Sequence, residues 1–130
     1  MLDTNIVSAL MRSPHDSVVR SSFDAVRPED VCLSIITAAE LKFGLAKRPS
    51  PRIARQLEAL FALVSIVPFA EPADQVYAEL RAHLERAGTL IGPHDLLIAA
   101  HALALDLTLV TDNLREFSRV PDLRVENWLD

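Results

Sequence analysis

The chain has 130 residues with a formal net charge of −5, and half of its residues are apolar. This length and apolar content predict one domain over residues 1–130, and the small number of Gly and Pro residues argues against disorder. A single cysteine excludes an internal disulfide, and the negative charge excludes a protein that binds nucleic acid with its whole surface. No apolar stretch can span a bilayer and the first residues lack the pattern of a secretion signal, so we expect a cytosolic protein with no membrane contact.

Short apolar strands alternate with helical patterns in the first half of the chain. In chain order we expect a strand over Met1–Asp3, helices over Asn5–Arg12 and His15–Val26, a strand over Val31–Ser34 and a helix over Thr37–Lys47. The last helix is expected to start at Thr37 because Thr37 and Glu40 have the spacing of a capping box.

The second half continues the same alternation. The expected elements are a helix from Pro51 to Val64, a strand over Ser65–Pro68, a helix over Pro72–Ala87 closed by Gly88, a buried helix over Asp95–Leu105, a strand over Leu107–Thr111, a short helix over Leu114–Ser118 and an edge strand over Arg124–Glu126. Alternating strands and helices predict an α/β fold with three α/β/α layers, in which a central, mainly parallel sheet of four to five short strands is flanked by helices.

Four acidic residues stand at junctions where a predicted strand ends or a predicted helix begins: Asp3, Glu40, Asp95 and Asp112. In an α/β fold such junctions meet at one edge of the sheet. Carboxylates crowded there repel one another unless a cation neutralises them, and Mg²⁺ prefers oxygen ligands. The pattern therefore predicts a metal site suited to phosphodiester chemistry.

Each acid also has a local explanation, and these alternatives stay open at the level of sequence. Asp3 and Asp95 can cap the helices that follow them, Glu40 can complete the capping box with Thr37, and Asp112 can shape a turn. The histidines lack the spacing of a zinc site. His94 is a candidate substrate contact beside Asp95, and His101 is expected in the core.

A basic segment without any acid runs from Leu41 to Leu57. It is either a solvated helix face or an arm that holds the phosphates of a polyanion near the acidic residues. The candidate phosphate-binding residues are Lys42, Lys47, Arg48, Arg52 and Arg55.

Together the acidic motifs resemble those of PIN-domain ribonucleases, and most closely those of VapC-type toxins of bacterial toxin–antitoxin pairs. The match follows the family's order over nearly the whole chain. The segments that carry it are Leu2–Ser8, Ile36–Leu41, Gly92–Ala100, Leu109–Asn113, Arg115–Pro121 and Val125–Leu129.

The resemblance implies a PIN-like fold and an endoribonuclease that depends on Mg²⁺ or Mn²⁺. It also implies a homodimer and a small VapB-like antitoxin that blocks the pocket and binds operator DNA. Fewer residues precede Asp3 than is usual in the family, so the first strand is expected to be short.

The resemblance also assigns roles to single residues. Asp3, Glu40 and Asp95 match the family's metal-binding acids, and Asp112 matches a fourth acidic position at which this subgroup often carries Asn. The further polar residues that match positions near the metal or its water are Asn5 and Thr111, with Asn113 and Glu116 as additional candidates.

These observations favour hydrolysis of RNA at a site formed by Asp3, Glu40, Asp95 and Asp112. An alternative is a catalytically weak PIN-like module that only binds, and acts with its antitoxin in a regulatory complex. A third possibility, a metal-dependent phosphatase for small phosphate esters, is disfavoured by the basic segment between Leu41 and Leu57.

Overall fold

Short parallel strands form the centre of the computed structural model, which describes all 130 residues. The strands are β1 (Cys32–Ser34), β2 (Ser65–Val67), β3 (Leu109–Val110) and β4 (Val125–Glu126), and β1 pairs with β2 as β3 pairs with β4. The first residues join the two pairs, because Leu2 N donates to Cys32 O at 3.0 Å and Asp3 N donates to Val110 O at 2.8 Å. The strand expected over Met1–Asp3 is therefore central, as predicted, but shrinks to one parallel bridge between Leu2 and Val110.

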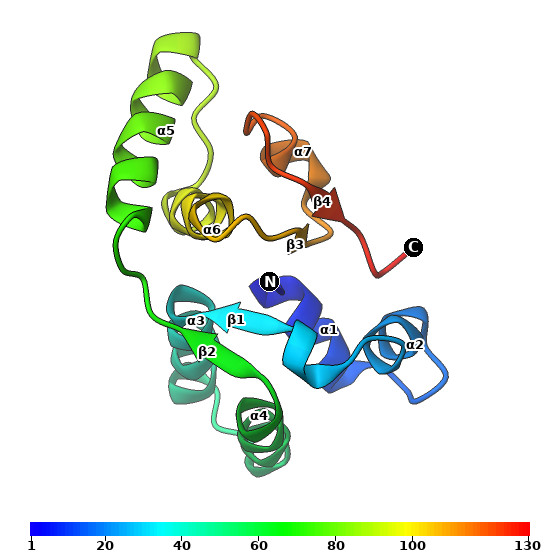
Figure 1. Cartoon of the computed structure of the whole chain (residues 1–130). Coiled ribbons are helices and arrows are strands. Elements are labelled where there is room, and N and C mark those ends of the chain that lie inside the picture. Colours follow the sequence, from blue (N-terminus) through cyan, green and yellow to red (C-terminus); the bar gives the residue numbers. More distant parts are fainter.

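Helices cover both faces of this sheet. They are α1 (Thr4–Arg12), α2 (Val18–Asp24), the 3₁₀ turn η1 (Pro28–Asp30), α3 (Ile35–Lys47), α4 (Pro51–Leu63), α5 (Ala73–Ala87), α6 (Pro93–Ala104) and α7 (Leu114–Phe117). In Figure 1, α5, α6 and α7 lie in the upper part of the view, whereas α1, α2 and α4 lie in the lower part. None of the helices has both the length and the apolar character that crossing a membrane requires.

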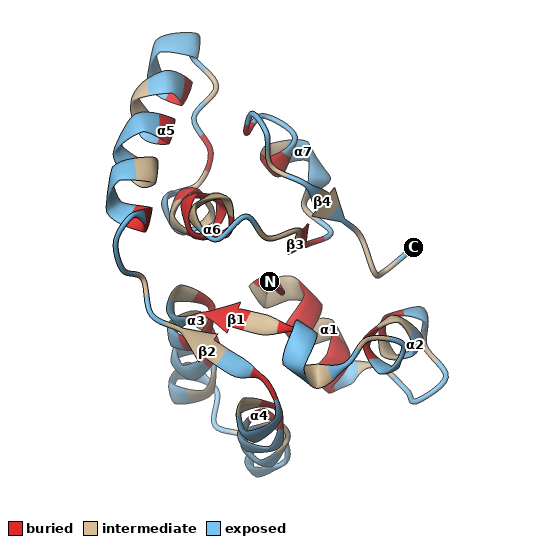
Figure 2. Cartoon of the chain, viewed as in Figure 1, coloured by how far each residue is buried: buried red, intermediate tan, exposed pale blue.

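Side chains that alternate along the strands supply two separate hydrophobic cores. Leu2 and Val110 belong to the core shared with α1, α2 and α4, whereas their neighbours Met1 and Leu109 belong to the core shared with α5, α6 and α7. This alternation is the two-residue period of a strand buried on both faces. Figure 2 shows the result, with buried residues on the sides of the helices that face the strands. The predicted three-layer α/β/α fold is confirmed.

The start of α3 differs from the sequence prediction. The helix begins at Ile35, because the Ser34 hydroxyl accepts from Ile36 N at 3.1 Å and caps the helix. Thr37 is fully buried in the helix and its hydroxyl has no hydrogen-bond partner, so the predicted capping box with Glu40 is wrong. As a consequence Glu40 lies in the second turn, on the part of α3 that faces α1.

Two other helix ends illustrate how well local signals work. Helix α2 begins at Val18 rather than at His15, because Ser17 accepts a hydrogen bond from Arg20 N and caps it. Helix α5 ends at Gly88 as predicted, since this residue adopts a φ of +68° that favours glycine.

Candidate active site

Asp3 lies where the central strand segment passes into α1. Its side chain accepts from Thr4 N and from Thr111 Oγ1, both at 2.8 Å, so it caps α1 and is also fixed from the end of β3. Only 4% of the residue is exposed. Burial raises the pKa of Asp3, the two hydrogen bonds oppose this, and the charges of Glu40 and Asp112 raise it further. The capping role and a role in a shared site are therefore compatible.

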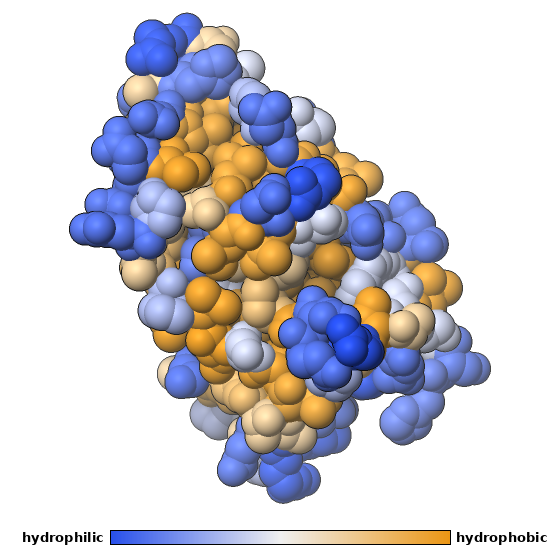
Figure 3. All heavy atoms as spheres, viewed as in Figure 1, coloured by the Kyte–Doolittle hydropathy of each residue, from blue (hydrophilic) through white to orange (hydrophobic).

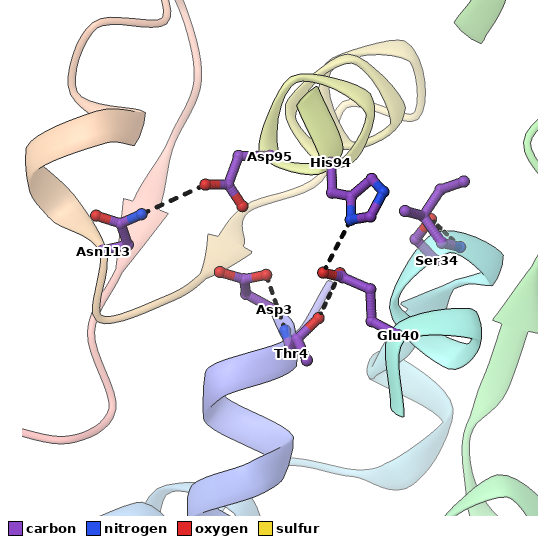
Figure 4. A network of polar contacts seen from close by, with 8 residues as sticks. Asp3, Thr4, Ser34, Glu40, His94, Asp95 and Asn113 are labelled. Atoms are coloured by element: carbon purple, nitrogen blue, oxygen red, sulfur yellow. Dashed lines mark hydrogen bonds and ion pairs between the residues drawn. The ribbon is translucent and has the colours of Figure 1, made fainter. Parts of the chain in front are cut away.

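Glu40 reaches the same region from α3. Its carboxylate accepts from Thr4 Oγ1 at 2.7 Å and is hydrogen-bonded to His94 Nδ1 at 3.3 Å. Figure 4 shows the side chain held between Thr4 of α1 and His94 of α6. These contacts link three elements that are distant in the sequence, and they leave Glu40 with no part in capping its own helix.

Asp95 lies in the first turn of α6, but it makes no capping hydrogen bond. Its carboxylate accepts instead from Asn113 Nδ2 at 3.5 Å, on the loop after β3 (Figure 4). Burial, followed by the contact with the Glu116 carboxyl and the charges of Asp3 and Glu40, raises the pKa of Asp95 to about 7. A carboxylate in this position is stabilised by protonation or by a nearby cation.

The three carboxylates line one cleft of about 290 Å³ that has no hydrophobic residue in its lining. The structure therefore brings together Asp3, Glu40 and Asp95 from α1, α3 and α6, at the carboxyl edge of the sheet. The remaining lining residues are Thr4, Asn5, Ser8, Arg12 and Asn113.

Asp112, the fourth acidic candidate, is placed differently. It is exposed, it accepts a hydrogen bond from Asn5 Nδ2, and it does not line the cleft. Its charge still contributes, as the smallest cause, to the raised pKa of Asp3. Asp112 therefore lies at the rim of the cleft, where Asn5 connects it to α1.

The sequence matches the family model of the PIN domain over residues 1–123. The chain belongs to the PIN-domain family. It is 37% identical to ribonuclease VapC2 of Rickettsia felis and 35% identical to the tRNA(fMet)-specific endonuclease VapC of Salmonella typhimurium, in each case covering 98% of this chain and 96% of the relative. Among solved structures, it is similar to VapBC2 from Rickettsia felis bound to a promoter DNA fragment, with a TM-score of 0.89 and 34% identity over 98% of this chain and 97% of that one. The resemblance to VapC-type PIN domains is thus confirmed.

Several residues that shape this PIN-domain cleft are not among the acids that the sequence singles out. Thr4 holds Glu40, and Ser8 and Arg12 continue the lining along α1. Their spacing of four residues places them on one face of the helix, and this polar stripe is the signal that could have revealed them. Glu116, an additional candidate, lies against Asp95 and Gly92, and the contact with Asp95 lowers the pKa of Glu116.

The basic segment does not act as one surface in this PIN domain. Lys42 Nζ lies 5.8 Å from the centre of the Phe61 ring, and Arg52 Nη1 donates to Met11 O at 3.5 Å. Among the five predicted cations, Arg48 is the one that lines a cleft together with Glu40. For Lys47 and Arg55 the structure gives no contact, so their role stays a prediction.

The chemistry of the cleft fits a hard divalent cation, since its acidic side chains are carboxylates, and burial and mutual repulsion raise the pKa values of Asp3 and Asp95. As the side chains lie here, no three His, Cys, Asp or Glu residues converge on one point as metal ligands do. Glu40 and Asp95 are instead hydrogen-bonded to Thr4, His94 and Asn113 on the walls of the cleft.

Proposed function

We propose that this chain is a metal-dependent endoribonuclease that hydrolyses RNA phosphodiester bonds, and that it acts as the toxin of a toxin–antitoxin pair. The observation that carries the proposal is the meeting of Asp3, Glu40 and Asp95 in one polar cleft, in a chain similar to proteins named as VapC ribonucleases. The three charges are unfavourable for one another without a cation, since the charge of Glu40 contributes to the raised pKa values of Asp3 and Asp95.

The carboxylates of Asp3, Glu40 and Asp95, with Asp112 at the rim, would hold Mg²⁺ or Mn²⁺. Such an ion lowers the pKa of a bound water and stabilises negative charge on a phosphate. The protein's part is to fix the carboxylates: Thr111 orients Asp3, Thr4 and His94 orient Glu40, and Asn113 orients Asp95. Without the ion, the same acids would repel an RNA backbone.

A VapB-like antitoxin that blocks the cleft and binds operator DNA is part of this proposal. It is supported by similar solved structures that are VapBC complexes, two of them described as bound to DNA. The homodimer expected from the family resemblance and the cytosolic location also belong to the proposal. The cytosolic location follows from the proposed function, because the RNA substrate and the operator DNA are both in the cytosol of a bacterium.

The decisive experiment replaces one acid at a time by its amide. We expect Asp3→Asn and Asp95→Asn to lower the rate of Mg²⁺-dependent RNA cleavage by about a hundredfold or more, because the amide keeps the shape and loses the charge that holds the ion. Cleavage is followed on purified protein freed of antitoxin, and folding is followed by circular dichroism and thermal melting.

Asp122→Asn is a matched control. Asp122 is exposed and has a φ of +67°, a conformation that Asn tolerates as well as Asp, so the same chemical change should leave cleavage intact. If wild-type protein binds RNA and antitoxin without cutting, the chain is a binding module that acts in a regulatory complex. The absence of converging ligands in the present side-chain arrangement is the observation that favours this alternative.

A further inference from the structure

A second cleft continues directly from the acidic one, between α1, α3 and the start of α4. It has a volume of about 170 Å³, and it shares Thr4, Ser8 and Glu40 with the acidic cleft. Its other end is lined by Arg48, which caps α3, and by Ser50, which caps α4. The two clefts form one continuous groove that leaves the carboxylates along α1. We call it the α1–α3 groove.

Three arginines lie in or beside the α1–α3 groove. Arg12 ends α1 and lines the acidic cleft, Arg48 lines the second cleft, and Arg52 donates to Met11 O next to Arg12. All three residues are exposed, and none forms an ion pair. Arginines without acidic partners, gathered beside a cleft, are suited to bidentate contacts with phosphate oxygens.

The spacing along α1 relates this cluster to the acidic residues. Thr4, Ser8 and Arg12 follow one another at intervals of four residues, so they lie on one face of the helix. Eight residues of α-helix span about 12 Å, which places Arg12 within a few nucleotides of a phosphate bound at the carboxylates. A polyanion in the groove would therefore meet the acidic site at one end and the arginines at the other.

We infer that the α1–α3 groove binds the RNA strand on one side of the cleaved bond, and that Arg12 and Arg48 hold the backbone phosphates of that strand. The inference rests on the proposed ribonuclease function and adds the path of the substrate and a residue, Arg12, that lies outside the basic segment from Leu41 to Leu57.

Arg12 has a simpler local role, since a cation in the last turn of a helix is favourable by itself. That role predicts a change in stability alone, whereas a phosphate contact predicts a change in the salt dependence of RNA binding. The two roles are therefore separated by measuring RNA affinity at several salt concentrations together with the melting temperature.

The test compares Arg12→Gln and Arg48→Gln with Arg86→Gln, each in the Asp95→Asn background so that binding is measured without cleavage. Arg86 is an exposed arginine at the end of α5, on the other side of the sheet, and its replacement by Gln changes the net charge by the same amount. With a short single-stranded RNA of mixed sequence in Mg²⁺, we expect each groove variant to bind roughly three- to tenfold more weakly than the control. Each should also lower the slope of log affinity against log salt by about one, and Arg12→Lys should restore the slope, because it keeps the charge, but only part of the affinity, because it loses the bidentate contact.

Gly44 provides a second test that does not depend on the arginine variants. Gly44 lines the groove and is exposed, and a Cβ added there meets no atom within 4 Å, so a side chain can be introduced at this position without a clash at its Cβ. Gly44→Glu should weaken RNA binding relative to Gly44→Gln, and Gly44→Lys should strengthen it. A series of RNAs can also be used, each with one neutral methylphosphonate linkage at a different position. At one position the substitution should weaken the binding of protein that retains Arg12, and at that position it should not change the binding of the Arg12→Gln variant.

The outcomes are distinguishable. If wild-type protein cleaves the RNA but Arg12→Gln and Gly44→Glu bind it as their controls do, the RNA path is wrong and the proposed function stands. If RNA binding is unchanged while the variants bind antitoxin more weakly, the groove belongs to the protein partner and the inference is overturned. If wild-type protein neither binds nor cleaves RNA, the proposed function itself fails.

Discussion

Asp95 connects the charge of the cleft to the stability of the protein. Its folded pKa is about 7, compared with an ordinary value of 3.8. Between these two values the folded protein binds more protons than the unfolded chain, so the contribution of Asp95 to the free energy of unfolding decreases as pH rises. Above pH 7 the charged carboxylate is a net cost in the absence of a cation.

This gives a prediction for metal-free protein. At pH 8 in the presence of a chelator, Asp95→Asn should melt at a temperature about 3 to 5 °C higher than wild type. This corresponds to a gain of about 1 kcal/mol in the free energy of unfolding once solvent screening is taken into account. The difference should shrink as pH falls from 7 towards 4, because wild-type Asp95 is then protonated. Differential scanning fluorimetry across pH measures it.

Adding Mn²⁺ completes this experiment. Ion binding to the folded form should raise the melting temperature of wild type with increasing Mn²⁺, and should do so much less in Asp95→Asn. Equal responses of the two proteins would place the ion elsewhere, and a wild type more stable than the variant in chelator at pH 8 would contradict the repulsion described for the cleft.

The sequence was sufficient to find the residues whose position follows from a single junction. Asp3, Glu40, Asp95 and Asp112 are predicted to lie together because parallel strands bring their carboxyl ends to one edge. The first three line one cleft, whereas Asp112 lies at its rim. The contact of Glu116 with Asp95 depends instead on where the short helix α7 packs, and Arg12 depends on which face of α1 borders α3. Such tertiary placements leave no local pattern, and only the polar stripe on α1 gave a partial signal.

At the scale of elements, the start of α3 shows why boundaries were predicted less well than the elements themselves. Ser34 and Thr37 are both good capping residues, and the spacing of Thr37 and Glu40 favoured Thr37. In the structure the Ser34 hydroxyl accepts a hydrogen bond from Ile36 N, and it is also hydrogen-bonded to Nδ1 of the buried His101 at 2.8 Å. The contact with α6 therefore decided between two local signals.

The same pair of residues supplies a stability prediction. Ser34→Ala removes the cap and leaves buried His101 without its partner, so it should lower the free energy of unfolding by about 1 to 3 kcal/mol. Thr37→Val removes a buried hydroxyl that has no partner and keeps the side-chain shape, so it should be neutral or stabilising by up to about 1 kcal/mol. Urea denaturation of the two variants measures both changes in the free energy of unfolding. A larger loss of stability for Thr37→Val than for Ser34→Ala would indicate that Thr37, and not Ser34, caps the helix.

At the scale of the whole molecule, the two cores follow from the two-residue alternation of the strands, but the surface does not. Apolar atoms reach the surface over a broad part of the face shown in Figure 3. On α3, Ile35 and Phe43 are 43% and 66% exposed, and Phe43 lines an apolar cavity of about 560 Å³ with Ile36, Leu97 and others. Exposed apolar side chains around a cavity of this size are typical of a surface that another protein covers.

The homodimer expected from the family resemblance would bury this face of α3 and α6. We therefore predict that the purified protein is dimeric and that Phe43→Glu shifts it to a monomer, because the charge would have to be buried against the second copy. Leu90→Glu is the matched control, since Leu90 is also an exposed apolar residue (43%, compared with 66% for Phe43) but lies in the loop before α6, outside this cavity. Sedimentation velocity at several concentrations distinguishes the species. If the Phe43→Glu variant is still a dimer, the dimer interface lies on another face. If the wild-type protein is a monomer, the apolar cavity beside Glu40 and His94 is the binding surface of a different partner.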